Sequence, residues 1–263
     1  MVKIFACPRL SVCNMYKNKK IGVVVPSYNE EKFIAAVIRG IPEYIDRVYV
    51  IDDFSVDNTN RIAGKVAEVD PRRIRIIRHE QNYGVGKAIT TGYKHCLEDS
   101  IDIAVVMAGD NQMDPAQLPN LLYPVLEGTA DYAVGDRISN FHHMKGMSQW
   151  RRLGNLFLKW LTRVAALNAS ICDPQNGYTA ITREVLLRLD LDHIYPRYGY
   201  CNDILVKLSA NRAKIKHVQM PAVYGVEKSK IRYCSYITSL TMLLFKNFLW
   251  RVKYKLLRRY NKL

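Results

Sequence analysis

Long apolar runs are absent from this chain of 263 residues. A membrane-spanning helix needs about 20 consecutive apolar residues. The longest uncharged stretch near the C-terminus covers only Tyr233 to Phe245, which contains several Ser, Thr and Tyr residues. Residues 1–20 also lack the apolar core that is typical of a signal peptide. We therefore expect a chain without a transmembrane segment.

Paired cysteines are also absent. The six cysteines are scattered along the sequence at positions 7, 13, 96, 172, 201 and 234, and no two form a C-x-x-C pair. In a chain of this length, such scatter argues against a disulfide framework or a structural zinc site. The sequence predicts reduced thiols and a cytoplasmic location.

Two common catalytic or phosphate-binding motifs are missing. The chain has no G-x-S-x-G nucleophile motif and no Walker sequence. The segment from Gly84 to Lys87 is too short for a Walker loop, and its match to G-x-G-x-x-G fails at Ile89. Its glycines either let the backbone approach a ligand at a helix N-terminus or only form a turn.

Acidic residues are scarce in the last 38 residues. From Val226 to Leu263 there are ten Lys or Arg residues and one acid, Glu227, so this tail carries nine of the fifteen net positive charges. Such charge suggests an anionic membrane surface or nucleic acid, or it only aids solubility. Nucleic acid is the weaker choice because the tail has no known recognition motif. Apolar residues recur here at helical spacing, at Ile237, Leu240, Leu244, Phe248, Val252 and Leu256. Their helix is expected either to lie in a membrane interface or to pack on the body with a charged outer face.

The body of the chain alternates short apolar segments with helical segments. The expected strands are Ile21–Val25, Arg47–Ile51, Ile74–Arg78, Ile101–Met107, Asp131–Gly135, Thr179–Ile181 and an extended segment at Ile215–Val223. Helices of 10 or more residues follow most of them, which predicts an α/β fold with a mostly parallel sheet flanked by helices. We divide the chain into an extension at residues 1–20, an α/β domain at residues 21–225 and a basic amphipathic segment at residues 226–263.

Acids or polar groups stand where four expected strands end, at Glu30, Asp53, Asp110 and the pair Asp136-Arg137. Ligands in open parallel sheets bind outside the carboxyl ends of the strands. Asp110 and Gln112 can offer oxygen ligands to a divalent cation, Mg²⁺ or Mn²⁺, although Asp110 could instead cap a turn. Asp114 and Pro115 are typical of a helix start. Ser55, Asp57 and Thr59 are expected to be helix caps.

Together these strand ends suggest a site for a nucleotide with a diphosphate. Asp53 could hold the base or the ribose, and Asp110 could bind the diphosphate through a cation. Arg137 and Lys230 could add positive charge. A metal would neutralise the charge that develops on a diphosphate leaving group.

The motifs V-V-V-P-S-Y-N-E-E, I-D-D-F-S-V-D-N-T, N-Y-G-V-G-K-A, A-G-D-N-Q-M-D-P, G-D-R, D-P-Q-N-G-Y and K-S-K-I follow one another between Ile21 and Arg232. In this order they resemble family 2 glycosyltransferases with the GT-A fold. The branch they resemble most is that of dolichyl-phosphate mannose synthases and related polyprenyl-phosphate sugar transferases. The resemblance implies an inverting enzyme that moves a sugar from a GDP- or UDP-linked donor.

The resemblance also implies roles for individual residues. Those that match nucleotide-sugar contacts are Pro26, Tyr28, Glu30, Ile51, Asp53, Gly109, Asp110, Arg137 and Lys230. Asp110 and Gln112 match the metal ligands. Two positions depart from the pattern. Ala108 stands where the family motif usually begins with an acid, which puts metal dependence in doubt. Tyr224 stands where mannose synthases tend to have an arginine, which weakens the case for mannose.

The resemblance leaves two acceptors open. A lipid phosphate at the membrane surface is already an anion and needs no strong base. A sugar hydroxyl of a polysaccharide or glycolipid must lose a proton, and Asp203 is then the candidate base, unless it only caps a helix. Asp173 could line the acceptor side or fix its turn. The alternative of another class is a non-catalytic binder, either of nucleotide sugars, as Ala108 suggests, or of an anionic surface, as the basic tail suggests. We expect a cytoplasmic protein that can bind peripherally to the cytoplasmic face of a membrane.

Overall fold

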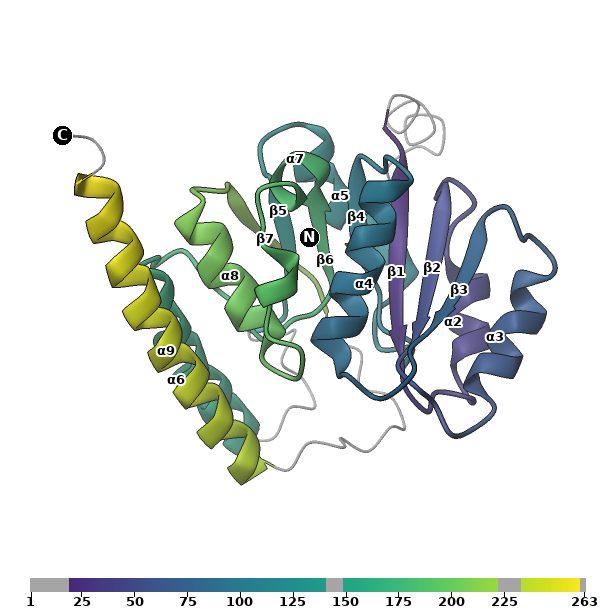
Figure 1. Cartoon of the computed structure of the whole chain (residues 1–263), viewed down its shortest axis with the longest axis horizontal. Coiled ribbons are helices and arrows are strands. Elements are labelled where there is room, and N and C mark those ends of the chain that lie inside the picture. The colour runs from purple at the N-terminus through teal and green to yellow at the C-terminus, as the bar shows by residue number, and fades with distance from the viewer. Residues whose placement is uncertain (1–18, 141–148, 222–232, 261–263) are drawn as a thin grey trace, which may run out of the picture.

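A seven-stranded sheet is the centre of the protein in a computed structural model, which describes residues 19–140, 149–221 and 233–260 (Figure 1). The strands are β1 Ile21–Ser27, β2 Arg47–Asp52, β3 Ile74–Arg78, β4 Ile103–Val106, β5 Tyr132–Asp136, β6 Thr179–Thr182 and β7 Ile215–Gln219. Their order in the sheet is β3-β2-β1-β4-β6-β5-β7. β6 runs antiparallel to both of its neighbours and the other pairs are parallel, so the expectation of a mostly parallel sheet is confirmed.

Helices cover both faces of the sheet. They are α2 Ile34–Gly40, α3 Thr59–Ala67, α4 Val85–Glu98, α5 Leu118–Leu126, α6 Gln149–Ala166, α7 Arg183–Leu186, α8 Tyr200–Ala210 and α9 Tyr233–Tyr260, with short 3-10 turns at Pro115–Gln117 and Leu191–His193. Residues of α2, α3 and α5 form one apolar core with the sheet, and α4, α6, α7, α8 and α9 form the other. Every residue of β1 is buried, as expected for a strand that is covered on both faces.

Close packing of α4 on the sheet depends on one glycine. A Cβ atom at Gly92 would lie 2.2 Å from Cγ1 of Val24 on β1, so any larger residue would push the helix away from the strand. The position of α4 matters for function because its first turn follows the loop that leaves β3.

The C-terminal helix packs on the body, but not as a simple amphipathic stripe. Leu240 and Leu244 are buried, and Phe248 packs against the same core. Ile237 and Leu256, which belong to the same predicted stripe, are exposed. α9 lies beside α6 at one end of the molecule (Figure 1). None of the helices in the described part of the chain is long and apolar enough to span a membrane.

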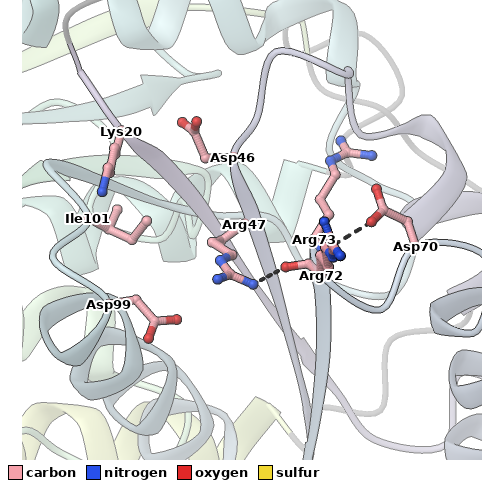
Figure 2. A pocket seen from close by; sticks show the side chains of 8 residues that line it. All are labelled: Lys20, Asp46, Arg47, Asp70, Arg72, Arg73, Asp99 and Ile101. Carbon is pink, nitrogen blue, oxygen red and sulfur yellow. Dashed lines mark hydrogen bonds between the residues drawn. The ribbon is translucent and has the colours of Figure 1, made fainter.

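A charged pocket lies at the opposite edge of the sheet from the strand ends discussed below. Its volume is about 350 Å³, and Figure 2 shows its lining residues, Lys20, Asp46, Arg47, Asp70, Arg72, Arg73, Asp99 and Ile101. Lys20, Asp46 and Arg47 stand at the amino-terminal ends of β1 and β2. Ligands of parallel sheets bind at the other edge, so we do not place the active site in this pocket.

Candidate active site

The carboxyl ends of three neighbouring strands, β2, β1 and β4, form the edge where the predicted residues gather. Each strand is followed by a non-glycine residue with positive φ: Phe54 at 65°, Asn29 at 55° and Asn111 at 60°. Such backbone conformations are uncommon outside glycine, and they turn each loop sharply at the strand end. Three tight turns side by side leave short, well-defined loops at this edge.

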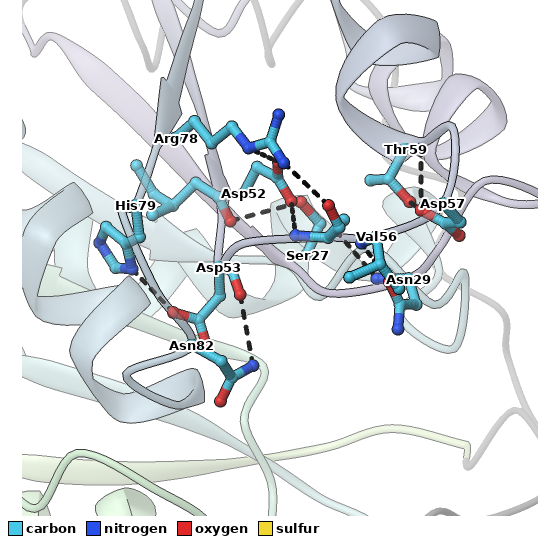
Figure 3. Close-up of polar contacts among 12 residues, drawn as sticks. Ser27, Asn29, Asp52, Asp53, Val56, Asp57, Thr59, Arg78, His79 and Asn82 are labelled. Atoms are coloured by element: carbon cyan, nitrogen blue, oxygen red, sulfur yellow. Dashed lines mark hydrogen bonds and ion pairs between the residues drawn. The ribbon is translucent and has the colours of Figure 1, made fainter.

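The loop after β1 is held by side chains of the loop after β2 (Figure 3). The backbone N–H groups of Asn29, Glu30 and Glu31 donate to Ser55 Oγ at 3.0 Å, Thr59 Oγ1 at 2.7 Å and Asp57 Oδ2 at 3.2 Å, respectively. Ser55 and Thr59 therefore join two loops, where the sequence suggested helix caps. Asp57 joins the two loops and also binds the start of α3, because its Oδ1 accepts the N–H of Thr59 at 2.9 Å.

The charge of Asp57 contributes to this junction. Burial opposes ionisation of its carboxyl group, but the hydrogen bonds from Thr59 and Glu31 outweigh that effect and lower its pKa. The carboxylate is therefore ionised at neutral pH and holds the two loops together.

Asp53 is buried at the end of β2 and binds the loop that precedes α4 (Figure 3). Its Oδ1 accepts the N–H of Tyr83 at 3.0 Å and lies 2.7 Å from Nδ1 of His79, and its Oδ2 accepts the N–H of Gly84 at 2.8 Å. A carboxylate can only accept, so Nδ1 of His79 carries the proton. Asp53 thus positions the loop from residue 82 to residue 84. Sequence reasoning missed His79, which is 26 positions away and belongs to no motif.

The two glycines of this loop approach the chain itself. A Cβ atom at Gly86 would lie 2.2 Å from the carbonyl oxygen of Tyr195, and one at Gly84, where φ is 99°, would lie 2.6 Å from that of Pro196. Lys87 N–H donates to the same Pro196 oxygen at 3.0 Å. The glycines therefore admit the segment at residues 195–196, whereas the sequence suggested a ligand or a plain turn.

Asp110 and Gln112 stand on the loop after β4, and both are partly buried. Asp110 Oδ1 accepts the N–H of Gln112 at 3.0 Å, which fixes the carboxylate above the turn. Gly109 lets this turn approach β1, because its N–H donates to Pro26 O at 3.1 Å and a Cβ atom would lie 3.1 Å from Cβ of Ser27. The expected helix start after this loop is confirmed, since Asp114 Oδ1 accepts the N–H of residue 116 at 2.9 Å.

The ligand set at this loop fits a cation that is shared with a diphosphate. Across the described residues, no group of three or more His, Cys, Asp or Glu side chains could hold a metal ion on its own. Asp110 and Gln112 offer one carboxylate and one amide. Mg²⁺ is commonly held by one or two carboxylates together with substrate phosphates and water, so the pair suits such a role.

The remaining residues that were expected to contact the nucleotide sugar follow from the strand order. Pro26 and Ile51 are direct neighbours in the register of β1 and β2, and Ile51 is fully buried. Tyr28, just after β1, is 40% exposed. Lys230 and Tyr224 lie outside the described residues.

Arg137, just after β5, is paired with the fully buried Asp173. Its Nε donates to Asp173 Oδ2 at 2.8 Å, its Nη2 donates to Oδ1 at 3.3 Å, and its own N–H donates to Oδ2 at 3.2 Å. Asp173 also accepts the N–H of Gln175 at 3.3 Å, so it fixes its turn as well as the arginine. A bidentate pair of this kind sets the direction of the guanidinium group.

Asn202 and Asp203 are buried in the first turn of α8, and Asp203 is not the cap of this helix. Asp203 Oδ2 accepts the N–H of Tyr195 at 2.7 Å and Lys207 Nζ at 2.8 Å, and its Oδ1 accepts Nδ2 of Asn247 on α9 at 2.9 Å. Three donors hold this carboxylate in a structural role. Its action as a base for a hydroxyl acceptor stays a prediction.

Comparison with known proteins assigns this chain to a family. A family model described as glycosyl transferase family 2 matches residues 22–190. UDP-N-acetylglucosamine–dolichyl-phosphate N-acetylglucosaminyltransferase of Methanococcus voltae is 31% identical over 219 residues, which cover 79% of this chain and 87% of that protein. Polyprenol monophosphomannose synthase of Mycolicibacterium smegmatis is 29% identical over 209 residues, which cover 77% of this chain and 76% of that protein.

A solved structure supports the fold. The crystal structure of glucosyl-3-phosphoglycerate synthase from Mycobacterium tuberculosis in complex with Mn²⁺, UDP and glucosyl-3-phosphoglycerate superposes with a TM-score of 0.65 at 20% identity, over 91% of this chain and 82% of that one. At this identity the likeness concerns the fold alone, which is the GT-A fold that the motifs predicted. With the family model and the relative from M. voltae, the conclusion is that this chain belongs to glycosyl transferase family 2 and is a glycosyltransferase.

Proposed function

We propose that this enzyme transfers a sugar from a UDP- or GDP-linked donor to the phosphate of a polyprenyl or dolichyl lipid, with inversion at the anomeric carbon. The observation that carries the donor part is the edge formed by β2, β1 and β4, where Asp53, Asp110 and Gln112 stand on tight neighbouring turns. The acceptor part is supported by the two relatives above, a dolichyl-phosphate N-acetylglucosaminyltransferase and a polyprenol monophosphomannose synthase.

The donor nucleotide would lie along this edge. Tyr28 and Glu30 would line the base and ribose above the buried Pro26, Ile51 and Asp53, and Gly109, Asp110, Arg137 and Lys230 would line the diphosphate. Tyr28 is exposed enough to contact a ligand, whereas buried Asp53 would act through the loop at residues 82–84. Asp173 would keep the Arg137 guanidinium directed.

A divalent cation, Mg²⁺ or Mn²⁺, would be held by Asp110 and Gln112 together with the diphosphate oxygens. When bound, it supplies positive charge against the negative charge that develops on the departing nucleoside diphosphate. Asp110 is kept in place for this by the N–H of Gln112.

The environment of Asp203 favours a phosphate acceptor over a hydroxyl acceptor. A lipid phosphate is already anionic and can attack without giving up a proton, so general-base catalysis is not needed. The three donors on Asp203 would hinder its action on a hydroxyl acceptor. We place the reaction at the cytoplasmic face of a membrane, where such lipids are accessible.

The test is a transfer assay with a panel of UDP- and GDP-sugars, Mn²⁺ or Mg²⁺, and a short-chain polyprenyl phosphate that dissolves in water. One donor should give a lipid-linked sugar product. Asp110→Ala should lower the rate by about 100-fold or more, because the only carboxylate of the ligand pair is lost. Asp190→Ala is the matched control, since Asp190 is exposed and pairs with the exposed His193. Unchanged transfer by Asp110→Ala would refute the metal assignment, and transfer only to sugar hydroxyls would refute the acceptor.

A further inference from the structure

Exposed apolar side chains concentrate on α6 and α9. Of the 19 large apolar residues that are exposed in the described part of the chain, twelve lie on these two helices or directly after α6. Phe157 and Trp160 on α6 are 47% and 59% exposed, and Phe245 and Trp250 on α9 are 61% and 39% exposed. Aromatic side chains of this size bury about 150–250 Å² each, so Phe157, Trp160 and Phe245 alone leave roughly 330 Å² uncovered. That already equals the largest apolar patch of a typical monomer, about 300–600 Å².

The two exposed stripes face the same side of the molecule. On α6, Thr162 is buried and accepts Nδ2 of Asn202 on α8 at 2.7 Å. On α9, Asn247 donates to Asp203 on α8 at 2.9 Å. Both helices thus turn their buried side toward α8. The stripes with Phe157 and Trp160 on α6 and with Phe245 and Leu249 on α9 are opposite at helical spacing and face away from α8, whereas Trp250 lies on the flank of α9 nearer to Asn247. The helices also pack on each other at the end of the molecule that is farthest from α3 (Figure 1).

The charged residues in the sequences of these two helices all have one sign. The sequences Gln149–Ala166 and Tyr233–Tyr260 contain ten Lys or Arg residues and no Asp or Glu. On α9, the exposed Lys246 and Lys253 stand beside the stripe that contains Met242, Phe245 and Leu249. Aromatic and aliphatic residues beside Lys and Arg are typical of helices that lie in the interface of an anionic bilayer.

We propose that α6 and α9 together form a docking surface for an anionic membrane, with the exposed stripes immersed in the headgroup region and the basic residues against lipid phosphates. This deepens the proposed function and rests on it, since a polyprenyl phosphate acceptor is carried in a bilayer. A second copy of the chain fits the surface less well, because two surfaces with only positive charges repel each other.

Buried polar contacts orient this surface relative to the site. Asn202 accepts Nε2 of Gln175 at 3.1 Å, and Gln175 belongs to the loop that contains Asp173, the partner of Arg137. Asp203 holds the N–H of Tyr195, whose segment packs on the Gly84–Gly86 loop. Asn202 and Asp203, which bond to α6 and α9, thus also bond to Gln175 and Tyr195 in the two segments near the site. A docked enzyme would therefore present its site at a fixed angle to the bilayer.

Cosedimentation with vesicles tests the docking surface. The full chain should bind vesicles of phosphatidylcholine with phosphatidylglycerol, and less at higher salt. Trp160→Ser and Phe245→Ser should each weaken binding about tenfold or more. Lys246→Gln with Lys253→Gln should weaken it by about fivefold per charge, whereas the exposed control pair Lys65→Gln with Lys216→Gln should leave it unchanged.

Transfer to the short-chain acceptor separates this proposal from the proposed function. Trp160→Ser should keep that activity with a soluble acceptor while it loses vesicle binding. Wild-type transfer without any vesicle binding at low salt would overturn the docking surface and leave the function standing. Vesicle binding that depends on Trp160, without transfer to any polyprenyl phosphate, would overturn the proposed function and leave the docking surface standing. A change of oligomeric state in Trp160→Ser, with vesicle binding intact, would assign the surface to a second copy and overturn the proposal.

Discussion

Replacing Asp53 by asparagine tests whether this residue positions the loop before α4. The carboxylate accepts two donors at Oδ1, from His79 and Tyr83, and one at Oδ2, from Gly84. In Asp53→Asn the best rotamer keeps the amide oxygen toward His79 and Tyr83, and its NH₂ group then faces the N–H of Gly84. One charge-assisted hydrogen bond is lost, and a buried N–H is left without an acceptor. Together these effects should lower the free energy of unfolding by about 2–4 kcal/mol.

Urea denaturation measures this change, and calorimetric titration with UDP or GDP in the presence of Mn²⁺ measures its effect on binding. If Asp53 acts through the loop, stability and nucleotide affinity should fall together. Asp190→Asn provides the matched control, because this exposed carboxylate should contribute less than about 1 kcal/mol to stability.

Two results would refute the reasoning. Stability within about 0.5 kcal/mol of the wild type would show that the three hydrogen bonds contribute little to the loop. A tenfold loss of nucleotide affinity at unchanged stability would show that Asp53 contacts the nucleotide directly, as the motif alone suggested.

Three further predictions concern the metal site, the glycine loop and the response to pH. Ala108→Asp restores a second carboxylate beside Asp110 and should tighten Mn²⁺ binding in the presence of a nucleoside diphosphate by about tenfold, measured by titration calorimetry. Gly86→Ala places a methyl group 2.2 Å from a backbone oxygen, so it should destabilise the fold by about 1–3 kcal/mol and weaken nucleotide binding, whereas Gly64→Ala, which meets no atom within 4 Å, should do neither. Burial lowers the pKa of His217 below 6.5 against the opposing effect of nearby carboxylates, so its neutral form stabilises the fold fully above pH 6.5. That contribution should decline as pH falls from 6.5 toward the lowered pKa, by at most about 1.4 kcal/mol per pH unit, and His217→Gln should flatten this part of the stability profile.

Local patterns in the sequence were enough to predict the main elements of the fold. The strands at residues 21, 47, 74, 103, 132, 179 and 215 all begin within two residues of their expected starts. Their apolar runs alternate with helical periodicity, and this alternation implies a parallel sheet with the loops of β1, β2 and β4 at one edge. The antiparallel position of β6 between β4 and β5 has no local signal, because strand direction depends on the path of the whole chain.

The sequence by itself determined the fold class, the family motifs and the residue types at the strand ends, since each of these depends on neighbours only a few positions apart. Only the tertiary structure decided what those residues contact. Asp53 finds donors 26 to 31 positions away, and Asp203 finds one on α9, 44 positions away. The buried side of α9 was likewise assigned by packing, because the predicted stripe contains Leu240 and Leu244, which are buried, as well as Ile237 and Leu256, which are exposed. A side chain is buried or exposed according to what the rest of the chain brings against it, and a linear pattern does not contain that information.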